Sequence, residues 1–504
     1  MTDAPARGAV PKEVRSLARG GSINLVGAAG SAVFSFAAFA VAARLHTTAQ
    51  VGAFTVAIAV FTILREVAQA GAQVGFTRFL PRDLASGNPE RLVTTLRVGL
   101  WIVLAAGIAA GAVAWSVGDG LATLLGQDAD GELVAQHLRW MAPAIPLTAV
   151  FLALTFATRG LGTMTPAAAV DNLGRAGLQL VFVVATGWLG AQWLGLAWAL
   201  PYVLALPVLV LWLRRLLDQH RALSTPDPMP LRDARRRFWA FSGPRGVAST
   251  LQVSVKWADT IPLGALAGAA EAGVYSIATR FLVVGSLASS AVMQVTGPRF
   301  SELITRGDQE GLQATFRTSA RWVVWTVWPM YLVLATFPEP LLRLFGPEYV
   351  EASTAVTVLA LATCLSAAAG SVDTVLLMSG RSWLSLGNWG GALVIDLGLA
   401  LVLIPRYGLL GAAIAWAASI VARNFIPLLQ VRHLLRVDPF GPGYLRALLT
   451  SGIVFGIGGL TVRTLLGPTL PGLAVLLGVA GPIYLFLVAR WRHHLYVAAP
   501  GGNR

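Results

Sequence analysis

A regularly spaced series of polar residues is the part of the sequence best suited to chemistry. Arg245, Ser249, Gln252, Lys256 and Asp259 recur at steps of four, three, four and three residues within a largely apolar stretch. This spacing places all five side chains on one face of a helix. The cations of this face suit the binding of an anion, and its carboxylate suits a coupling ion.

Three further apolar stretches carry polar stripes of the same kind. A shift of 221 positions relates the first of them to the stretch of Lys256, and the second to the third. Their polar residues are Asn24, Ser31 and Ser35 in the first, Arg65, Gln69 and Gln73 in the second, and Arg280, Ser286, Ser290 and Gln294 in the third. Charge inside a membrane is costly and points by default to a cavity or pathway. We predict one water-accessible cavity between two lobes, with Arg65, Arg245, Lys256 and Arg280 as its cations and the polar residues of the stripes as its lining.

Four carboxylates are candidate sites for a coupling proton or sodium ion: Glu66, Asp259, Asp373 and Asp396. Glu66 adjoins Arg65, and Asp259 lies three residues from Lys256, so ion pairing that only holds helices together is the competing interpretation. For Asp171 and Arg175, which lie four residues apart, we favour that structural role.

Sequence signatures of other chemistry do not occur. The chain has no GxxxxGK phosphate loop, no HExxH or CxxC spacing, six scattered histidines and a single cysteine, Cys364. We therefore expect a membrane transporter, not an enzyme, with no catalytic residue, no metal site and no cofactor.

Composition indicates the surroundings in which these residues work. Of the 504 residues, 56% are hydrophobic and only 12% are charged, whereas soluble domains carry about 25% charge. Apolar windows of about 20 residues, the length of a membrane-crossing helix, recur along the whole chain. We predict an all-α polytopic membrane protein with about 14 transmembrane helices, near residues 22–43, 51–76, 93–116, 138–158, 167–188, 193–213, 241–266, 272–296, 318–337, 353–378, 383–404, 409–431, 445–465 and 470–489.

The basic residues set the predicted orientation. The net charge is +14, and cytoplasmic loops retain arginine and lysine. Outward-facing connections would hold only Arg44, Arg343, Arg406 and Arg463, whereas the termini and inward connections hold most of the other bases. We predict a multi-pass protein of the cytoplasmic membrane with both termini in the cytoplasm, and the phospholipid membrane, not nucleic acid, as the partner of its basic loops.

The chain divides into two halves that resemble copies. The shift of 221 positions places residues 51–79 on residues 272–300 without a gap, and seven of the 29 positions are identical. Copies of equal orientation are parallel repeats about an axis along the membrane normal. The predicted organisation begins with a cytoplasmic N-terminal segment (1–21), for which an interfacial helix is one alternative. There follow an N-lobe of six spans (22–213), a basic linker (214–240), a C-lobe of six spans (241–436), two added spans (437–489) and a cytoplasmic tail (490–504).

Short motifs give the sequence a family resemblance. Residues 344–349 (LFGPEY), 272–276 (AGVYS), 407–413 (YGLLGAA) and 78–81 (RFLP) resemble the bacterial polysaccharide flippases, the lipid-linked oligosaccharide branch of the MATE-like superfamily. The resemblance covers about residues 15–440. It implies two six-helix lobes in a V, alternating access, and transfer of a polyprenyl-diphosphate-linked oligosaccharide, the repeat unit of a cell-surface polysaccharide, from the inner to the outer face.

The resemblance also implies cavity cations on the first, second, seventh and eighth spans. Here the first span offers Asn24 and serines in place of a cation. Arginine binds a diphosphate with a two-pronged fork, and lysine binds it as a point charge. A membrane potential that is negative inside favours the outward movement of each negative charge by about 2.3 kcal/mol per 100 mV. The implied partners are the lipid-linked saccharide substrate and polysaccharide-assembly proteins.

Three alternatives remain open from the residues. A flippase for the peptidoglycan precursor, of the lipid II type, shares the lipid diphosphate. A MATE-like small-molecule exporter shares the fold, but its cavity would be less cationic. A membrane saccharide polymerase or ligase would need a sizeable outward loop, whereas every predicted outward loop is shorter than about 20 residues and reads as a connection.

Overall fold

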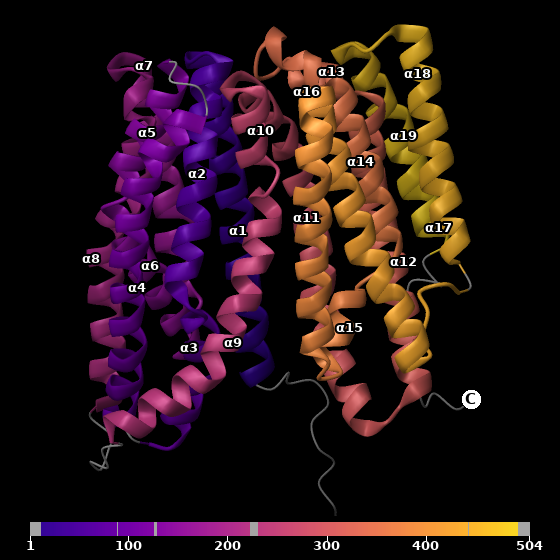
Figure 1. Cartoon of the computed structure of the whole chain (residues 1–504). Helices are drawn as coiled ribbons and strands as arrows, with labels where there is room; N and C mark the ends of the chain where they lie inside the picture. The colour runs from indigo at the N-terminus through magenta and orange to yellow at the C-terminus, as the bar shows by residue number, and fades with distance from the viewer. Residues whose placement is uncertain (1–11, 88, 125–128, 222–229, 442, 492–504) are drawn as a thin grey trace, which may run out of the picture. The chain divides into compact units, whose positions relative to one another are not determined.

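A computed structural model describes residues 12–87, 89–124, 129–221, 230–441 and 443–491 (Figure 1). Every regular element in these residues is a helix, and long apolar helices run through the whole chain. Only helices and closed barrels satisfy the backbone polar groups within a bilayer. The chain is thus an all-α polytopic membrane protein, as predicted.

The described residues contain fewer candidate membrane-crossing helices than the 14 spans predicted from the sequence. Ten helices of the described residues are long and apolar enough to cross a membrane, or 11 if the bent pair Asp130–Met141 and Ala144–Gly160 counts as one span. All 14 predicted windows are nonetheless predominantly helical. The difference arises because α16 (Ser382–Leu435) covers two windows and because α9 (Leu231–Trp257) and α12 (Gln309–Thr336) carry more polar residues.

The helices fall into two compact units. Unit 1 comprises Met1–Phe39, Val60–Gly120 and Ala135–Thr250, and unit 2 comprises Ala40–Ala59, Leu121–Val134 and Leu251–Arg504. The predicted lobe boundaries in the linker 214–240 stay a prediction. Residues 1–11 of the predicted N-terminal segment, 222–229 of the linker and 492–504 of the tail lie outside the described residues.

The helices that lie wholly or partly in unit 1 follow one another along the first half of the chain. They are α1 (Lys12–Leu45), α2 (Thr48–Gln69), α3 (Ala72–Ala85), α4 (Pro89–Leu124), α5 (Ala129–Met141), α6 (Ala144–Gly160), the π-helix η1 (Ala167–Arg175), α7 (Ala176–Leu189), the short η2 (Ala191–Trp193), α8 (Leu194–Arg221) and α9.

Glycines set the closest approaches in unit 1. A Cβ on Gly107 would lie 2.6 Å from the backbone of Pro146, and one on Gly111 would lie 2.8 Å from the carbonyl oxygen of Ala142, so α4 passes directly against the α5–α6 bend. This is the close packing that a GxxxG spacing provides. Gly71 has a φ of 81°, ends the helical path between α2 and α3, and faces the backbone of Ser242 on α9.

Unit 2 contains the remaining helices. They are α10 (Thr260–Ala267), α11 (Ala269–Arg306), α12, α13 (Pro338–Leu342), η3 (Pro347–Ala352), α14 (Ser353–Ala368), α15 (Val372–Met378), α16, α17 (Tyr444–Ser451), η4 (Gly452–Ile457), α18 (Gly458–Leu466) and α19 (Leu470–Arg490). The helical path of α16 breaks at Gly408, whose φ is 52° and ψ is −132°. The Glu271 carboxylate accepts a hydrogen bond from the Leu409 N–H at 2.5 Å, which stabilises the break.

Residues related by the 221 shift meet inside unit 2. A Cβ on Gly52 would lie 1.6 Å from the Ala269 carbonyl oxygen, and one on Gly273 would lie 2.0 Å from the Thr48 carbonyl oxygen. One turn further on, Thr55 Oγ1 lies 3.1 Å from Ser276 Oγ. These contacts join α2 and α11 within unit 2, and the organisation as two repeats stays a prediction.

Candidate functional site

The candidate site is a cavity of about 390 Å³ in unit 2. It forms where α9 stops at Trp257 and α10 starts at Thr260, so that the break exposes side chains to the space between helices. Its lining comes from α2, α9, α10, α11, α12, α14 and α16: Thr55, Val255, Lys256, Trp257, Asp259, Thr260, Ser276, Thr279, Arg280, Leu282, Val283, Ser286, Tyr331, Thr363, Trp416, Ser419, Ile420 and Arg423.

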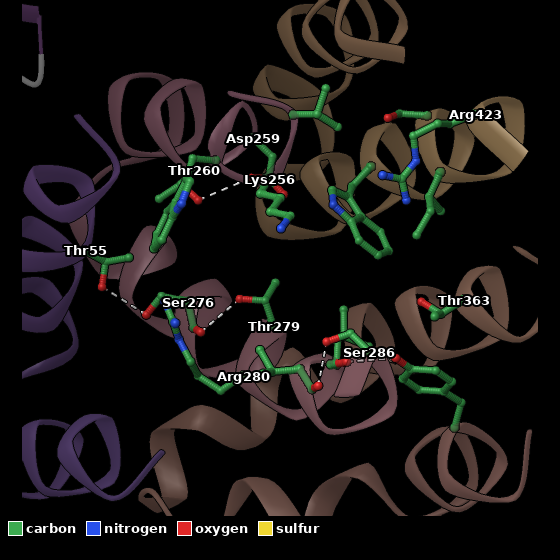
Figure 2. Close-up of a pocket in the computed structure, with 18 residues that line it drawn as sticks. Thr55, Lys256, Asp259, Thr260, Ser276, Thr279, Arg280, Ser286, Thr363 and Arg423 are labelled. Carbon is green, nitrogen blue, oxygen red and sulfur yellow. Dashed lines mark hydrogen bonds between the residues drawn. The ribbon is translucent and has the colours of Figure 1, made fainter. Parts of the chain in front are cut away.

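Three cations from three helices border this cavity. Lys256 comes from the last turn of α9, Arg280 from the first half of α11 and Arg423 from the second half of α16 (Figure 2). The Arg280 guanidinium lies 5.5 Å from the Trp257 ring centroid, and the Arg423 guanidinium lies 4.2 Å from the Trp389 ring centroid. Aromatic faces hold guanidinium groups in place without neutralising them.

Two of these cations were predicted from the sequence, and Arg423 was missed. The signal for it exists, because Trp416, Ser419, Ile420 and Arg423 follow the i, i+3, i+4, i+7 spacing of one helix face. That stripe has only two polar members, Ser419 and Arg423, so it stands out little from the apolar span around it. Arg423 therefore extends the predicted set of cations.

Hydroxyl groups supply the rest of the polar surface. Thr279 Oγ1 donates to the Ser276 carbonyl at 3.0 Å, Ser286 Oγ donates to the Val283 carbonyl at 2.7 Å, and the Tyr331 hydroxyl donates to the Leu282 carbonyl at 2.8 Å. Each of these oxygens keeps lone pairs for a further donor. Figure 2 shows the labelled hydroxyls on the same cavity as the cations.

One carboxylate of the cavity is buried and interacts electrostatically with a second buried carboxylate. Asp259 is 2% exposed and accepts hydrogen bonds from the Tyr275 hydroxyl and, at 3.2 Å, from the Thr260 hydroxyl. Asp396 on α16 is fully buried, and neither of its oxygens has a hydrogen-bond donor in the described part of the chain. The two carboxylates interact electrostatically. Two buried carboxylates that repel each other are more stable when a proton or a bound cation removes part of their charge.

The other two predicted coupling carboxylates have hydrogen-bond donors. Asp373 accepts from the Ser385 hydroxyl at 2.6 Å and from the Trp389 indole at 3.4 Å. Glu66 accepts from the Gln73 amide at 2.7 Å. These contacts suit a structural role, and for Asp373 that role includes holding the ring that Arg423 covers.

Arg65 belongs to unit 1, where it contacts aromatic side chains. Its Nη1 donates to the Tyr202 hydroxyl at 3.0 Å, and its guanidinium lies 5.7 Å from the Tyr202 ring centroid. Arg175 covers the same ring at 4.6 Å and forms an ion pair with Asp171 at 2.6 Å. The predicted ion pair of Asp171 and Arg175 is confirmed. Arg65 and Arg175 lie over the same Tyr202 ring.

Arg245 also belongs to unit 1, on the exposed side of α9. Its guanidinium lies 3.8 Å from the Phe241 ring centroid, and that of Arg78 lies 3.9 Å from the same centroid. The unit 2 cavity therefore unites Lys256 and Arg280 but includes neither Arg245 nor Arg65. One cavity with all four cations stays a prediction.

Among the polar residues of the predicted stripes, Ser286 borders the unit 2 cavity, whereas nine others do not: Asn24, Ser31, Ser35, Gln69, Gln73, Ser249, Gln252, Ser290 and Gln294. Some of them bond within their own helix bundle. Gln69 donates to the Ala149 carbonyl at 3.2 Å, and the Ser290 hydroxyl donates to the Ser286 carbonyl at 2.8 Å. The role of these nine residues in a cavity stays a prediction.

Comparison with known proteins places this architecture among transporters. The MatE family model matches residues 26–185 and 244–383, together more than half of the chain. A probable low-salt glycan biosynthesis flippase, Agl15 of Haloferax volcanii, is 24% identical over 257 residues, which span 49% of this chain and 52% of that protein. The match thus spans about half the length of this curated relative.

Solved structures of low sequence identity share the fold. The lipid II flippase MurJ, in an inward closed conformation, has a TM-score of 0.71 at 12% identity and covers 96% of this chain and 100% of its own. An inward-facing multidrug resistance MATE transporter has a TM-score of 0.59 at 16% identity, with 81% and 94% coverage. A MOP superfamily transporter from Pyrococcus furiosus has a TM-score of 0.56 at 15% identity and covers 84% of this chain and 96% of its own. The binding pocket of that transporter has reverse polarity.

Proposed function

The chain belongs to the MatE family of membrane transporters, and we propose that it is a flippase for a polyprenyl-diphosphate-linked oligosaccharide. It would move this saccharide unit of the cell surface from the inner to the outer face of the cytoplasmic membrane by alternating access. The observation that carries the proposal is the meeting of Lys256, Arg280 and Arg423 around one cavity in unit 2.

The charge of the cavity supports an anionic cargo. Three cations and one carboxylate, Asp259, border the cavity. The net charge of these four groups is therefore positive whether Asp259 is protonated or ionised. A diphosphate has oxygens for two arginine forks and one lysine. Such contacts gain strength in a low-dielectric surrounding.

The size and shape of the cavity fit the linkage region of the cargo. Its volume of about 390 Å³ lies at the small end of ligand sites. It would hold the diphosphate and the first sugar, with the indole rings of Trp257 and Trp416 as flat walls. The remaining sugars and the polyprenyl chain would extend beyond it.

We also propose that Asp259 and Asp396 form the coupling site for a proton or a sodium ion. Both are buried, they interact with each other, and Asp259 borders the same cavity as the three cations. Uptake of a cation by this pair would change the charge next to the bound diphosphate. Glu66 and Asp373 suit coupling less well, because neither borders this cavity and hydrogen bonds already hold both carboxylates.

The names of two similar proteins support lipid-linked cargo. Agl15 is named as a glycan biosynthesis flippase, and MurJ, whose structure matches this chain over its whole length, is named as a lipid II flippase. A flippase for a lipid II type precursor is accordingly the second candidate, since it shares the diphosphate. An exporter of cationic drugs fits less well, because three cations border the cavity.

Transport in vesicles tests the proposal. The purified chain would be reconstituted into liposomes containing a fluorescent polyprenyl-diphosphate trisaccharide, and dithionite quenching would report the fraction that crosses the bilayer. We expect transfer of the diphosphate lipid and none of a phosphatidylcholine carrying the same fluorophore. Transfer of both lipids at equal rates, or of neither while the vesicles take up a fluorescent organic cation, would refute it.

A further inference from the structure

A second cavity lies in unit 1, where the first half of α9 rests against α4. Its volume is about 740 Å³, and it is lined by Ile102, Arg232, Asp233, Arg235, Arg236, Trp239 and Ala240. The proposed transport has no use for this set of residues. Its composition is unusual, because three arginines share the space with an indole ring and an aliphatic side chain of a membrane-crossing helix.

The first half of α9 is amphipathic and firmly held. Ala234 and Phe238, four residues apart, are 4% and 1% exposed, and the Phe238 ring packs 5.2 Å from that of Phe76 and 5.8 Å from that of Phe79. The Arg237 guanidinium donates to the buried Asp83 carboxylate at 2.5 Å. The segment is therefore an anchored helix, not a loose basic tail.

The opposite side of the same segment carries the charge. Arg232, Arg235 and Arg236 are exposed and, together with Trp239, follow the spacing of one helix face. The Trp239 indole donates to the Val98 carbonyl of α4 at 3.4 Å, which fixes the ring between the two helices. Three cationic groups are thus presented around a cavity whose wall is apolar.

This cavity adjoins a lipid-facing surface. Helix α4 is a candidate membrane span over Glu90–Gly118, and its Trp101 and Ile108 are 65% and 58% exposed. Large apolar side chains that stay exposed on a span face acyl chains, and tryptophan prefers the level of the headgroups. Basic groups on an amphipathic helix at this level attract anionic lipids.

We propose that this cavity binds the headgroup of an anionic phospholipid of the surrounding membrane. Arg232, Arg235 and Arg236 hold the phosphate, and Ile102 and Trp239 contact the first methylenes of the acyl chains. The Asp233 carboxylate accepts a hydrogen bond from a headgroup hydroxyl, which favours phosphatidylglycerol among anionic lipids. The site recognises a resident lipid and is independent of the transported cargo.

The experiment measures lipid binding by the full chain. The delipidated protein in detergent would be titrated with phosphatidylglycerol or phosphatidylcholine, and native mass spectrometry would count bound lipids. In the variant R232Q/R235Q/R236Q we expect the tightest phosphatidylglycerol site to weaken at least about tenfold, since three arginines that attract the anionic headgroup are lost. Phosphatidylcholine binding should stay unchanged.

A charge-matched control separates the site from bulk attraction. The variant R82Q/R214Q/R215Q removes three exposed arginines of unit 1 that do not line the cavity, and it should keep the wild-type affinity. The variant R232K/R235K/R236K keeps the charge and should keep most of the binding, which guards against misfolding of the glutamine variant. Equal weakening in both glutamine variants, equal affinity for both lipids, or displacement of phosphatidylglycerol by millimolar inorganic phosphate would overturn the proposal.

Discussion

Replacing Asp396 by asparagine tests the proposed coupling pair most sharply. Asp396 is fully buried, its two carboxylate oxygens have no hydrogen-bond donor among the described residues, and Asp259 is its electrostatic neighbour. Asparagine has nearly the same shape and carries no charge, so it removes the repulsion with Asp259. We expect the variant to fold without needing a bound cation.

The burial of Asp396 sets the size of the expected change in stability. An unsatisfied buried polar group costs about 1–3 kcal/mol, and more when it is charged, so the asparagine variant should be more stable than the ion-free wild type by at least this amount. A cation that binds only the folded wild type adds about 2.7 kcal/mol at one hundred times its dissociation constant. The variant should lose this dependence entirely.

Thermal unfolding of the detergent-solubilised chain measures both effects. Tm would be compared in sodium chloride and in choline chloride, each between pH 5.5 and pH 8, for wild type, Asp396→Asn and the control Asp373→Asn. Wild type and the control should respond to sodium or to acid, and Asp396→Asn should respond to neither. A wild-type Tm that is indifferent to both, or an asparagine variant that keeps the full response, would refute the reasoning.

Three further predictions follow from close contacts and from the cavity. In Gly52→Ala the added Cβ, ideally placed, would lie only 1.6 Å from the Ala269 carbonyl oxygen. We therefore expect the free energy of unfolding to fall by about 1–3 kcal/mol, measured by chemical denaturation. Asp83→Asn removes the charge that Arg237 binds at a 3%-exposed carboxylate, and should cost about 1–3 kcal/mol in the same assay. Arg423→Lys keeps the charge but loses the planar fork, so transport of the diphosphate lipid should fall about tenfold while the amount of folded protein stays unchanged.

Much of the fold was predictable because lipid restricts the options so strongly. A run of about 20 apolar residues in a bilayer has to be a helix, and each predicted window is predominantly helical. Two windows, 383–404 and 409–431, were predicted as separate spans, and the helical path of α16 does break between them, at Gly408. The part that the sequence did not predict is the Glu271 carboxylate, which accepts a hydrogen bond from the Leu409 N–H and stabilises the break.

The candidate site was only partly predictable. Lys256 and Arg280 were identifiable because each interrupts an apolar stretch at a helical spacing, a local property of the sequence. Arg423 was missed because its stripe has few polar members. The electrostatic interaction of Asp259 with Asp396 joins the α9–α10 break to a helix more than one hundred residues later, and no local pattern encodes it.

The central claim is that Lys256, Arg280 and Arg423 together bind a lipid diphosphate. Its most direct measurement is the dissociation constant of a water-soluble, short-chain prenyl-diphosphate saccharide, determined by isothermal titration calorimetry for wild type and for the three alanine variants. Each charge-assisted contact is worth about 1.5–3 kcal/mol, so each variant should bind at least about tenfold more weakly, while Arg306→Ala, at the exposed end of α11, should bind as wild type does. Wild-type affinity in all three cavity variants, or equal affinity for the same compound without its phosphates, would contradict the account.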